Sequence, residues 1–99
     1  MTVCVVCAPH GVAETVDVAQ GEIHHLLDGG VTFVGAIATH DTYVVARDGC
    51  VGPVNVWYAR RPEWFHAAPR GPIVFFASDA EGREVDLSPA ARAQLDGYK

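Results

Sequence analysis

GPIVFFASDAEGREVDLSPAARAQL, the stretch from Gly71 to Leu95, decides the fold of this chain. Its apolar run from Ile73 to Ala77 is typical of a buried strand, because β-branched and aromatic side chains pack well on a pleated surface. Ser78 to Gly82 have the composition of a turn, and Arg83 to Leu87 alternate as a second strand would. The stretch therefore predicts a strand, a turn and a second strand.

A helix is expected directly after these two strands. Ser88 can accept a hydrogen bond from an amide of the first helical turn, and Pro89 stands where a missing amide is harmless. No catalytic or phosphate-binding motif lies between Gly71 and Leu95. We interpret this part of the chain as scaffold.

The N-terminal part predicts a hairpin followed by a short helix. Val3 to Ala8 form a continuous apolar run, Pro9 to Gly11 supply a turn, and Val12 to Val18 suit a hairpin partner. From Gly21 to Leu27 apolar residues recur at three- and four-residue spacing, which indicates a helix. The glycine pair at 29–30 ends that helix.

The middle of the chain predicts a second hairpin, one further strand and a loop. Val31 to Thr39 and Thr42 to Arg47 are β-rich runs on either side of a short polar turn. Val54 to Ala59 are interpreted as another strand, and Pro69 to Pro72 close an ordered loop. The order ββαβββ followed by ββα predicts a single compact domain over residues 1–99. Its class is α+β, with a small, mostly antiparallel sheet, a short helix after the first hairpin and a C-terminal helix.

Composition and charge narrow the classes of protein. With 99 residues, 49% of them hydrophobic and 19% charged, the chain is long enough for one core. The net charge of −5 argues against general nucleic-acid binding, since duplex binding depends on many cationic contacts to phosphate.

The start of the chain and its cysteines indicate the compartment. No basic leader precedes Pro9, and the apolar run before it is far shorter than the roughly 18 residues of a membrane span. Three cysteines do not make a complete disulfide framework. We expect free thiols, a cytoplasmic location and no membrane partner.

Cys4 and Cys7 form a C-x-x-C pair with His10 three residues further on, a spacing that zinc and redox sites use. In a strand, however, residues three apart point to opposite faces and cannot share a metal ion. We expect buried thiols and no cofactor, with a metal or redox site as the alternative.

Two further groups of side chains could carry chemistry. His24 and His25 are interpreted as surface residues, because they flank the apolar stripe of the predicted helix. The alternative is a catalytic or pH-sensitive pair, which needs an orienting carboxylate; Glu22 and Asp28 are the nearest in sequence. An acidic cluster near the end of the chain is interpreted as a solvated face, with calcium or magnesium binding as the alternative. The cluster comprises Asp79, Glu81, Glu84 and Asp86.

The segment from Asn55 to Arg70, NVWYARRPEWFHAAPR, is the strongest candidate for binding. It combines aromatic planes with guanidinium groups, which stack on bases, grip phosphates or anchor protein interfaces. The candidate contact residues are Asn55, Trp57, Tyr58, Arg60, Arg61, Trp64, His66 and Arg70. The alternative is that a tryptophan fills the core while the arginines keep the loop soluble.

Three segments carry a family resemblance: LLDGGV at Leu26 to Val31, ARDGCVGPVN at Ala46 to Asn55, and GPIVFFASDAEGREVDLS at Gly71 to Ser88. Together they resemble small proteins of unassigned function that are carried by bacteriophages and mobile elements, especially those of Gram-positive hosts. The resemblance implies a phage accessory protein in a bacterial host cytoplasm. It implies no catalytic residues.

Three functions are therefore expected, in order. The first is a non-enzymatic protein that binds a host bacterial protein and inhibits a host process or defence. The second is a binder of a small anionic, nucleotide-like ligand held between an aromatic ring and the arginines. The third is a small metal-dependent enzyme that uses His24 and His25. A homodimer is also expected, because small β-rich domains often cover an edge or an apolar patch by pairing.

Overall fold

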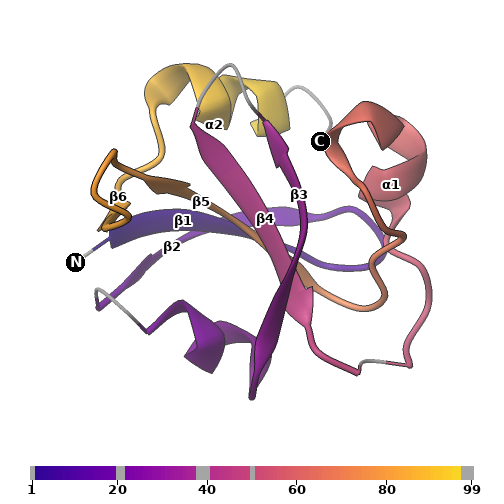
Figure 1. Cartoon of the computed structure of the whole chain (residues 1–99). Helices are drawn as coiled ribbons and strands as arrows, with labels where there is room; N and C mark the ends of the chain where they lie inside the picture. Colours follow the sequence, from indigo (N-terminus) through magenta and orange to yellow (C-terminus); the bar gives the residue numbers. More distant parts are fainter. Residues whose placement is uncertain (1, 20–21, 38–40, 50, 97–99) are drawn as a thin grey trace.

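The computed structural model describes residues 2–19, 22–37, 41–49 and 51–96. These residues form a six-stranded antiparallel sheet with short helices, an α+β architecture (Figure 1). The strands are β1 (Thr2–Cys7), β2 (Ala13–Val18), β3 (Val31–Ile37), β4 (Thr42–Arg47), β5 (Ile73–Ser78) and β6 (Glu84–Val85). The helices are the 3-10 helix η1 (Ile23–Leu27), α1 (Val56–Arg60), the 3-10 helix η3 (Pro62–Trp64) and α2 (Pro89–Asp96).

Strand β5 is the centre of the sheet, whose order is β2-β1-β5-β4-β3. Its sequence IVFFAS is apolar on both faces, and five of its six residues are buried. Such a run suits a strand with neighbours on both sides and cover above and below. The short β6 pairs with the last two residues of β5, beside β1, and Leu87 donates its backbone amide to the Val3 carbonyl.

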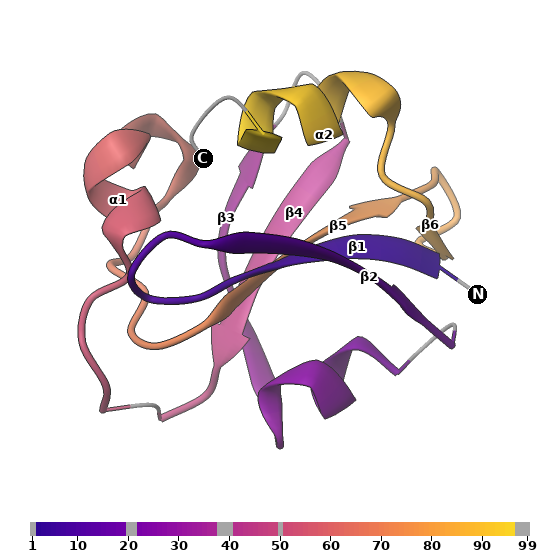
Figure 2. The ribbon, with the colours of Figure 1, turned by 180° about the vertical axis from the view of Figure 1, so that it is seen from behind.

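The two faces of the sheet bury two separate clusters. Helices α1, η3 and α2 cover one face, where Trp57, Trp64, Ala91 and Leu95 pack on the sheet. Helix η1 covers part of the other face through Ile23 and Leu27. Figures 1 and 2 show this arrangement from opposite sides, with α2 and η1 on either side of the strands. The second face is therefore left partly open.

Much of the predicted local structure is confirmed. Both hairpins form, and β4 has the predicted bounds. The helix that follows the first hairpin is a 3-10 turn, and the second strand of the C-terminal pair shortens to Glu84–Val85. The Ser88 hydroxyl accepts from the Ala91 amide at 3.1 Å, as the capping pattern predicts. Residues 20–21 and 38–40, which the predicted elements include or adjoin, lie outside the described residues.

The predicted strand from Val54 to Ala59 is wrong. Residues Val56–Arg60 form the helix α1, because Asn55 caps it: its side chain accepts from the Trp57 amide. Only Val54 retains a β character, as an isolated bridge to Arg70. The β-branched and aromatic composition of this segment favours a strand. A buried cap and the packing of Trp57 override that preference.

The outer edge of β3 is covered by the segment that follows η3. Gly35 bridges to Phe65, and the His66 amide donates to the Val34 carbonyl at 2.9 Å. The register of β3 against β4 shifts between Phe33 and Gly35, so β3 carries a bulge at this place. A side chain at residue 35 would overlap the backbone carbonyl of Trp64, which explains the glycine.

Among the described residues, no helix has the length and apolarity needed to cross a lipid bilayer.

Candidate functional site

The predicted binding segment divides into buried and exposed residues. Asn55 and Trp57 are completely buried, and Trp64 is nearly so. Trp57 and Trp64 stack at 6.2 Å, and both contact the Phe75 ring edge-on. These three candidates therefore belong to the core and are not available at the surface. The alternative that a tryptophan fills the core is the correct one, and it holds for both.

Asn55 joins three parts of the chain through one amide. Its Nδ2 donates to the Cys7 carbonyl at 3.2 Å and to the Gly71 carbonyl at 2.9 Å, and its Oδ1 accepts from the Trp57 amide at 3.0 Å. A buried amide with these partners is a structural device, since each partner would otherwise lose a hydrogen bond away from water. Both N–H groups of the Asn55 side chain are therefore engaged within the protein, and neither is left for a ligand.

The two adjacent arginines cover the tryptophans. The Arg60 guanidinium lies 5.3 Å from the Trp57 ring centre and donates to the Gly11 carbonyl. Arg61 lies 4.3 Å from the Trp64 ring centre and forms an ion pair of 2.8 Å with Glu63. Cation–π contacts of this kind hold a guanidinium in place. Both arginines already stack on the rings that a nucleotide base would need.

The remaining candidates lie at the surface but do not converge. Arg70 donates to the Gly52 carbonyl at 3.3 Å. Tyr58 is exposed and meets Phe65 edge-on at 5.9 Å, and His66 is exposed beside β3. Of these three, His66 lines a groove that is large enough to receive a ligand group.

An aromatic cluster that the sequence reasoning missed occupies the open face of the sheet. Phe33 on β3 and Tyr43 on β4 are 58% and 38% exposed, and both rings contact Phe76 on β5. The three ring centres are 6.1, 6.1 and 5.9 Å apart. We call these three residues the aromatic platform. Exposed Phe and Tyr side chains gathered in one patch are a feature of binding surfaces.

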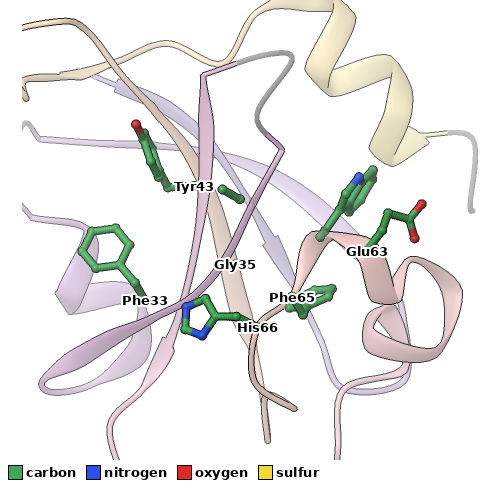
Figure 3. A pocket seen from close by; sticks show the side chains of 8 residues that line it. Phe33, Gly35, Tyr43, Glu63, Phe65 and His66 are labelled. Carbon is green, nitrogen blue, oxygen red and sulfur yellow. The ribbon is translucent and has the colours of Figure 1, made fainter.

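Phe33 and Tyr43 of the aromatic platform form one wall of a groove of about 570 Å³. Figure 3 shows Phe33 and Tyr43 on one side of β3, Glu63 and Phe65 on the other, and His66 between the two groups. The groove crosses β3 where Gly35 lets the segment after η3 approach closely. Its volume lies within the range of sites that hold a small molecule or an anchoring side chain.

Carboxylates border the platform. Four neighbouring hollows include Phe33 or Tyr43 in their walls, and every residue with a permanent charge that lines them is acidic. These residues are Glu63, Glu84, Asp41 and Asp79. Hydrogen bonds from its own backbone and from Arg61 lower the pKa of Glu63, so it is ionised at neutral pH. Arg61 and Arg83 each bind one of the four carboxylates, but neither lines one of these four hollows.

Alternation along the strands contains a signal for the platform. On β4, Tyr43 alternates with the buried Thr42 and Val44, and on β3, Phe33 precedes the buried Val34. The pairing of β3 with β4 then places Phe33 and Tyr43 on a shared face. Phe76 joins them because β5 pairs with β4 in register with Tyr43. Finding the platform therefore required the strand order, which the linear pattern does not contain.

Cys4 and Cys7 lie on opposite faces of β1, as the alternation predicts. Cys4 packs in the cluster under η1 and Cys7 in the cluster under the helices, so they cannot bind one metal ion together. Burial raises the pKa of the Cys4 thiol to about 11, helped by Glu84 and Asp17. Burial raises that of Cys7 to about 12. His10 is exposed in the turn that follows.

Two carboxylates of the C-terminal acidic cluster, Asp79 and Asp86, accept hydrogen bonds from backbone amides. Asp79 accepts from the backbone amides of Glu81 and Arg83 and from the Arg83 side chain, and these bonds lower its pKa. Asp86 accepts from the Val3 amide at 2.8 Å. The carboxylates are thus spread over a turn and a strand end, which agrees with the interpretation of a solvated face.

Glu22, His24 and His25 are brought together by the 3-10 turn. The ligand atoms of the three side chains all lie within 4.8 Å of one another. Sequence reasoning named Glu22 as a neighbour of the histidines, and the fold places its carboxylate against both rings.

Comparisons with protein-family models, with curated proteins and with the solved structures found no match for this chain.

Proposed function

We propose that this protein is a non-enzymatic binding module that grips a basic, apolar-anchored segment of a partner protein on the aromatic platform. The observation that carries the proposal is the pair Phe33 and Tyr43, exposed on the partly open face of the sheet and beside a groove of about 570 Å³. The sequence predicts a binding surface on the tryptophans and arginines of α1 and η3. The proposed surface lies instead at the edge of β3.

The platform is preassembled. Phe33 and Tyr43 meet edge-on at 6.1 Å, and Phe76 supports both rings from a nearly buried position. Rings held in this way lose little conformational entropy when a partner binds. Aromatic side chains with such support are typical hot spots of protein interfaces.

The charges favour a cationic partner. Carboxylates border the hollows around the platform, and the chain carries a net charge of −5. Lysine or arginine residues beside an apolar anchor would meet complementary potential at this rim.

The same charges weigh against an anionic, nucleotide-like ligand. A phosphate would approach Glu63 and Glu84, while Arg60 and Arg61 are engaged with the tryptophans. Such a ligand remains the second candidate, with the Tyr43 hydroxyl and the His66 ring as groove side chains able to donate a hydrogen bond to it.

The resemblance to phage and mobile-element proteins makes a protein of the bacterial host the partner to test first. In that setting the module would act in the host cytoplasm and inhibit a host process or defence by occupying its target. A second copy of this chain is the competing occupant of the platform, because an exposed apolar patch can also be covered by pairing.

The test uses two synthetic peptides of the same length, each with a central Trp-Phe anchor, one flanked by lysines and the other by glutamates. They are titrated into the isotopically labelled protein, and amide chemical shifts are followed by NMR. We expect the lysine peptide alone to bind, with the largest shifts at Phe33, Ala36, Tyr43 and His66. The double variant Phe33→Ser/Tyr43→Ser should lose this binding.

Val51→Ser provides the matched control, because Val51 is 92% exposed and lines none of the hollows around the platform. It should bind as the unmodified protein does. Equal binding by the double variant, or shifts centred on Arg60 and Arg70, would refute the platform as the site. Sedimentation that shows a dimer, dissociated by the double variant, would instead assign the platform to a second copy.

A further inference from the structure

Three side chains converge at the start of η1 in an arrangement suited to a metal ion. His25 Nδ1 lies 2.7 Å from Glu22 Oε2, and His24 Nε2 lies 4.0 Å from the same oxygen. The two imidazole rings are 4.2 Å apart and inclined at 65°. All three side chains remain partly exposed.

The short turn explains the convergence. In a 3-10 turn residues three apart lie above one another, which places Glu22 under His25. The Glu22 carboxylate makes no capping hydrogen bond to the helix that it precedes, so it is directed at the rings rather than the backbone. Ile23 and Leu27, at the two ends of η1, are buried and hold the turn on the sheet.

The Glu22 Oε2 atom is enclosed although its side chain is 40% exposed. It lies 2.7 Å from His25 Nδ1, and both atoms carry lone pairs when unprotonated, so they are close enough to bind the same ion. In a tetrahedral zinc site neighbouring ligand atoms are about 3.4 Å apart. The observed 2.7 and 4.0 Å lie on either side of that separation, so small side-chain rotations suffice.

We propose that Glu22, His24 and His25 form a surface site for a divalent transition metal ion, with Zn²⁺ as the best-matched ion. Two imidazoles and one carboxylate are ligands that Zn²⁺ accepts, and three protein ligands leave a position open to solvent. The site is independent of the buried thiols, because burial raises their pKa and a thiolate is the form that binds metal.

The site borders the aromatic platform. His24 lines the same hollow as Phe33 and Glu84. An ion held there has its open coordination position next to the proposed binding surface, where a histidine or carboxylate of a partner could complete it. Metal binding itself does not depend on the proposed function.

The test is calorimetric titration of ZnCl₂ into the untagged full chain in a buffer that does not chelate zinc. The unmodified protein should bind one ion per chain. His24→Ala and His25→Ala should each weaken binding at least about tenfold, and Glu22→Gln should weaken it by about as much. Circular dichroism checks that these exposed substitutions leave the fold intact.

His10→Ala is the matched control, because it removes an exposed histidine outside the cluster, and it should leave the affinity unchanged. Co²⁺ gives an independent readout, because a tetrahedral nitrogen and oxygen site absorbs visible light without a thiolate charge-transfer band. No zinc binding by the unmodified protein, unchanged binding in both His24→Ala and His25→Ala, or a thiolate band with Co²⁺ would each overturn the proposal.

Discussion

Asn55 shows how much one buried residue can organise at the residue scale. Its amide ties the end of β1 to the start of α1 and to Gly71, just before β5. These segments are 48 and 16 residues away from Asn55 in sequence, so the contacts link elements that strand pairing alone does not join. The side chain therefore contributes to the fold and not to ligand binding.

Asn55→Ala should destabilise the protein by about 3 kcal/mol, because it leaves two carbonyls and one amide without a partner in the interior. Urea unfolding followed by tryptophan fluorescence measures the loss. Ser88→Ala, which removes one partly buried cap bond, serves as the comparison and should lose about 1 kcal/mol. Similar losses in the two variants would contradict the role assigned to Asn55.

The buried thiols predict a loss of stability at alkaline pH. Burial raises the pKa of Cys4 to about 11 and of Cys7 to about 12, above the ordinary value of 9.0. The unfolded chain therefore loses its thiol protons first as the pH rises. The contribution to stability is complete below pH 9.0 and disappears as the pH approaches 12.

Urea unfolding at about pH 8 and about pH 10.5 tests this expectation, and the free energy of unfolding should be lower at the higher pH. Cys4→Ala/Cys7→Ala should show a smaller fall over the same interval. An equal fall in this double variant would assign the alkaline sensitivity to other groups.

At the scale of elements, the contact between β3 and the segment after η3 shapes the groove. Gly35 lies against the Trp64 carbonyl, and the His66 amide donates to the Val34 carbonyl. The backbones of β3 and of the segment after η3 therefore meet without a side chain between them. This close approach brings Phe65 to the side of the groove opposite Phe33 and Tyr43, with His66 between them (Figure 3).

Gly35→Ala should therefore destabilise the protein by about 2 kcal/mol and open the groove, since the new methyl group must displace backbone. Thermal unfolding measures the first effect, and hydrogen exchange of the His66 amide measures the second. Gly30→Ala is the control, because a methyl group there would meet its nearest atom, in Asp48, at an ordinary 3.9 Å. Undiminished protection of the His66 amide in Gly35→Ala would contradict this account of the groove.

At the scale of the whole molecule, the sheet has one covered face and one partly open face, and the open one carries the aromatic platform within an acidic border. A chain with a net charge of −5 attracts cationic partners over a distance that salt shortens. In the proposed interaction, the association rate should therefore depend on salt, whereas the apolar contact at the platform should not.

Raising NaCl from about 0.05 to about 0.5 M should weaken binding of the lysine peptide several-fold, mainly through slower association. Surface plasmon resonance separates the association and dissociation rates. Phe33→Ser/Tyr43→Ser should instead increase the dissociation rate. An affinity that does not change with salt would contradict the proposed role of the charges. The double variant would then test the apolar anchor by itself.

Local patterns were sufficient for most of the fold. The apolar run Ile73 to Ala77 predicts the central strand, Ser88 and Pro89 predict the start of α2, and strand alternation predicts that Cys4 and Cys7 point apart. In each case neighbours along the chain decide the outcome, because alternation, turn chemistry and capping act over a few residues. The α+β class follows from the order of these elements.

The candidate site was beyond the reach of such patterns. Trp57 and Trp64 have the composition of a contact surface and lie in the core, while Phe33 and Tyr43 look like ordinary strand residues and lie exposed. Which aromatic residues are buried depends on how β3, β4 and β5 pair and on which face the helices cover. Those contacts join residues far apart in sequence, so only the tertiary structure decides which aromatic residues lie exposed.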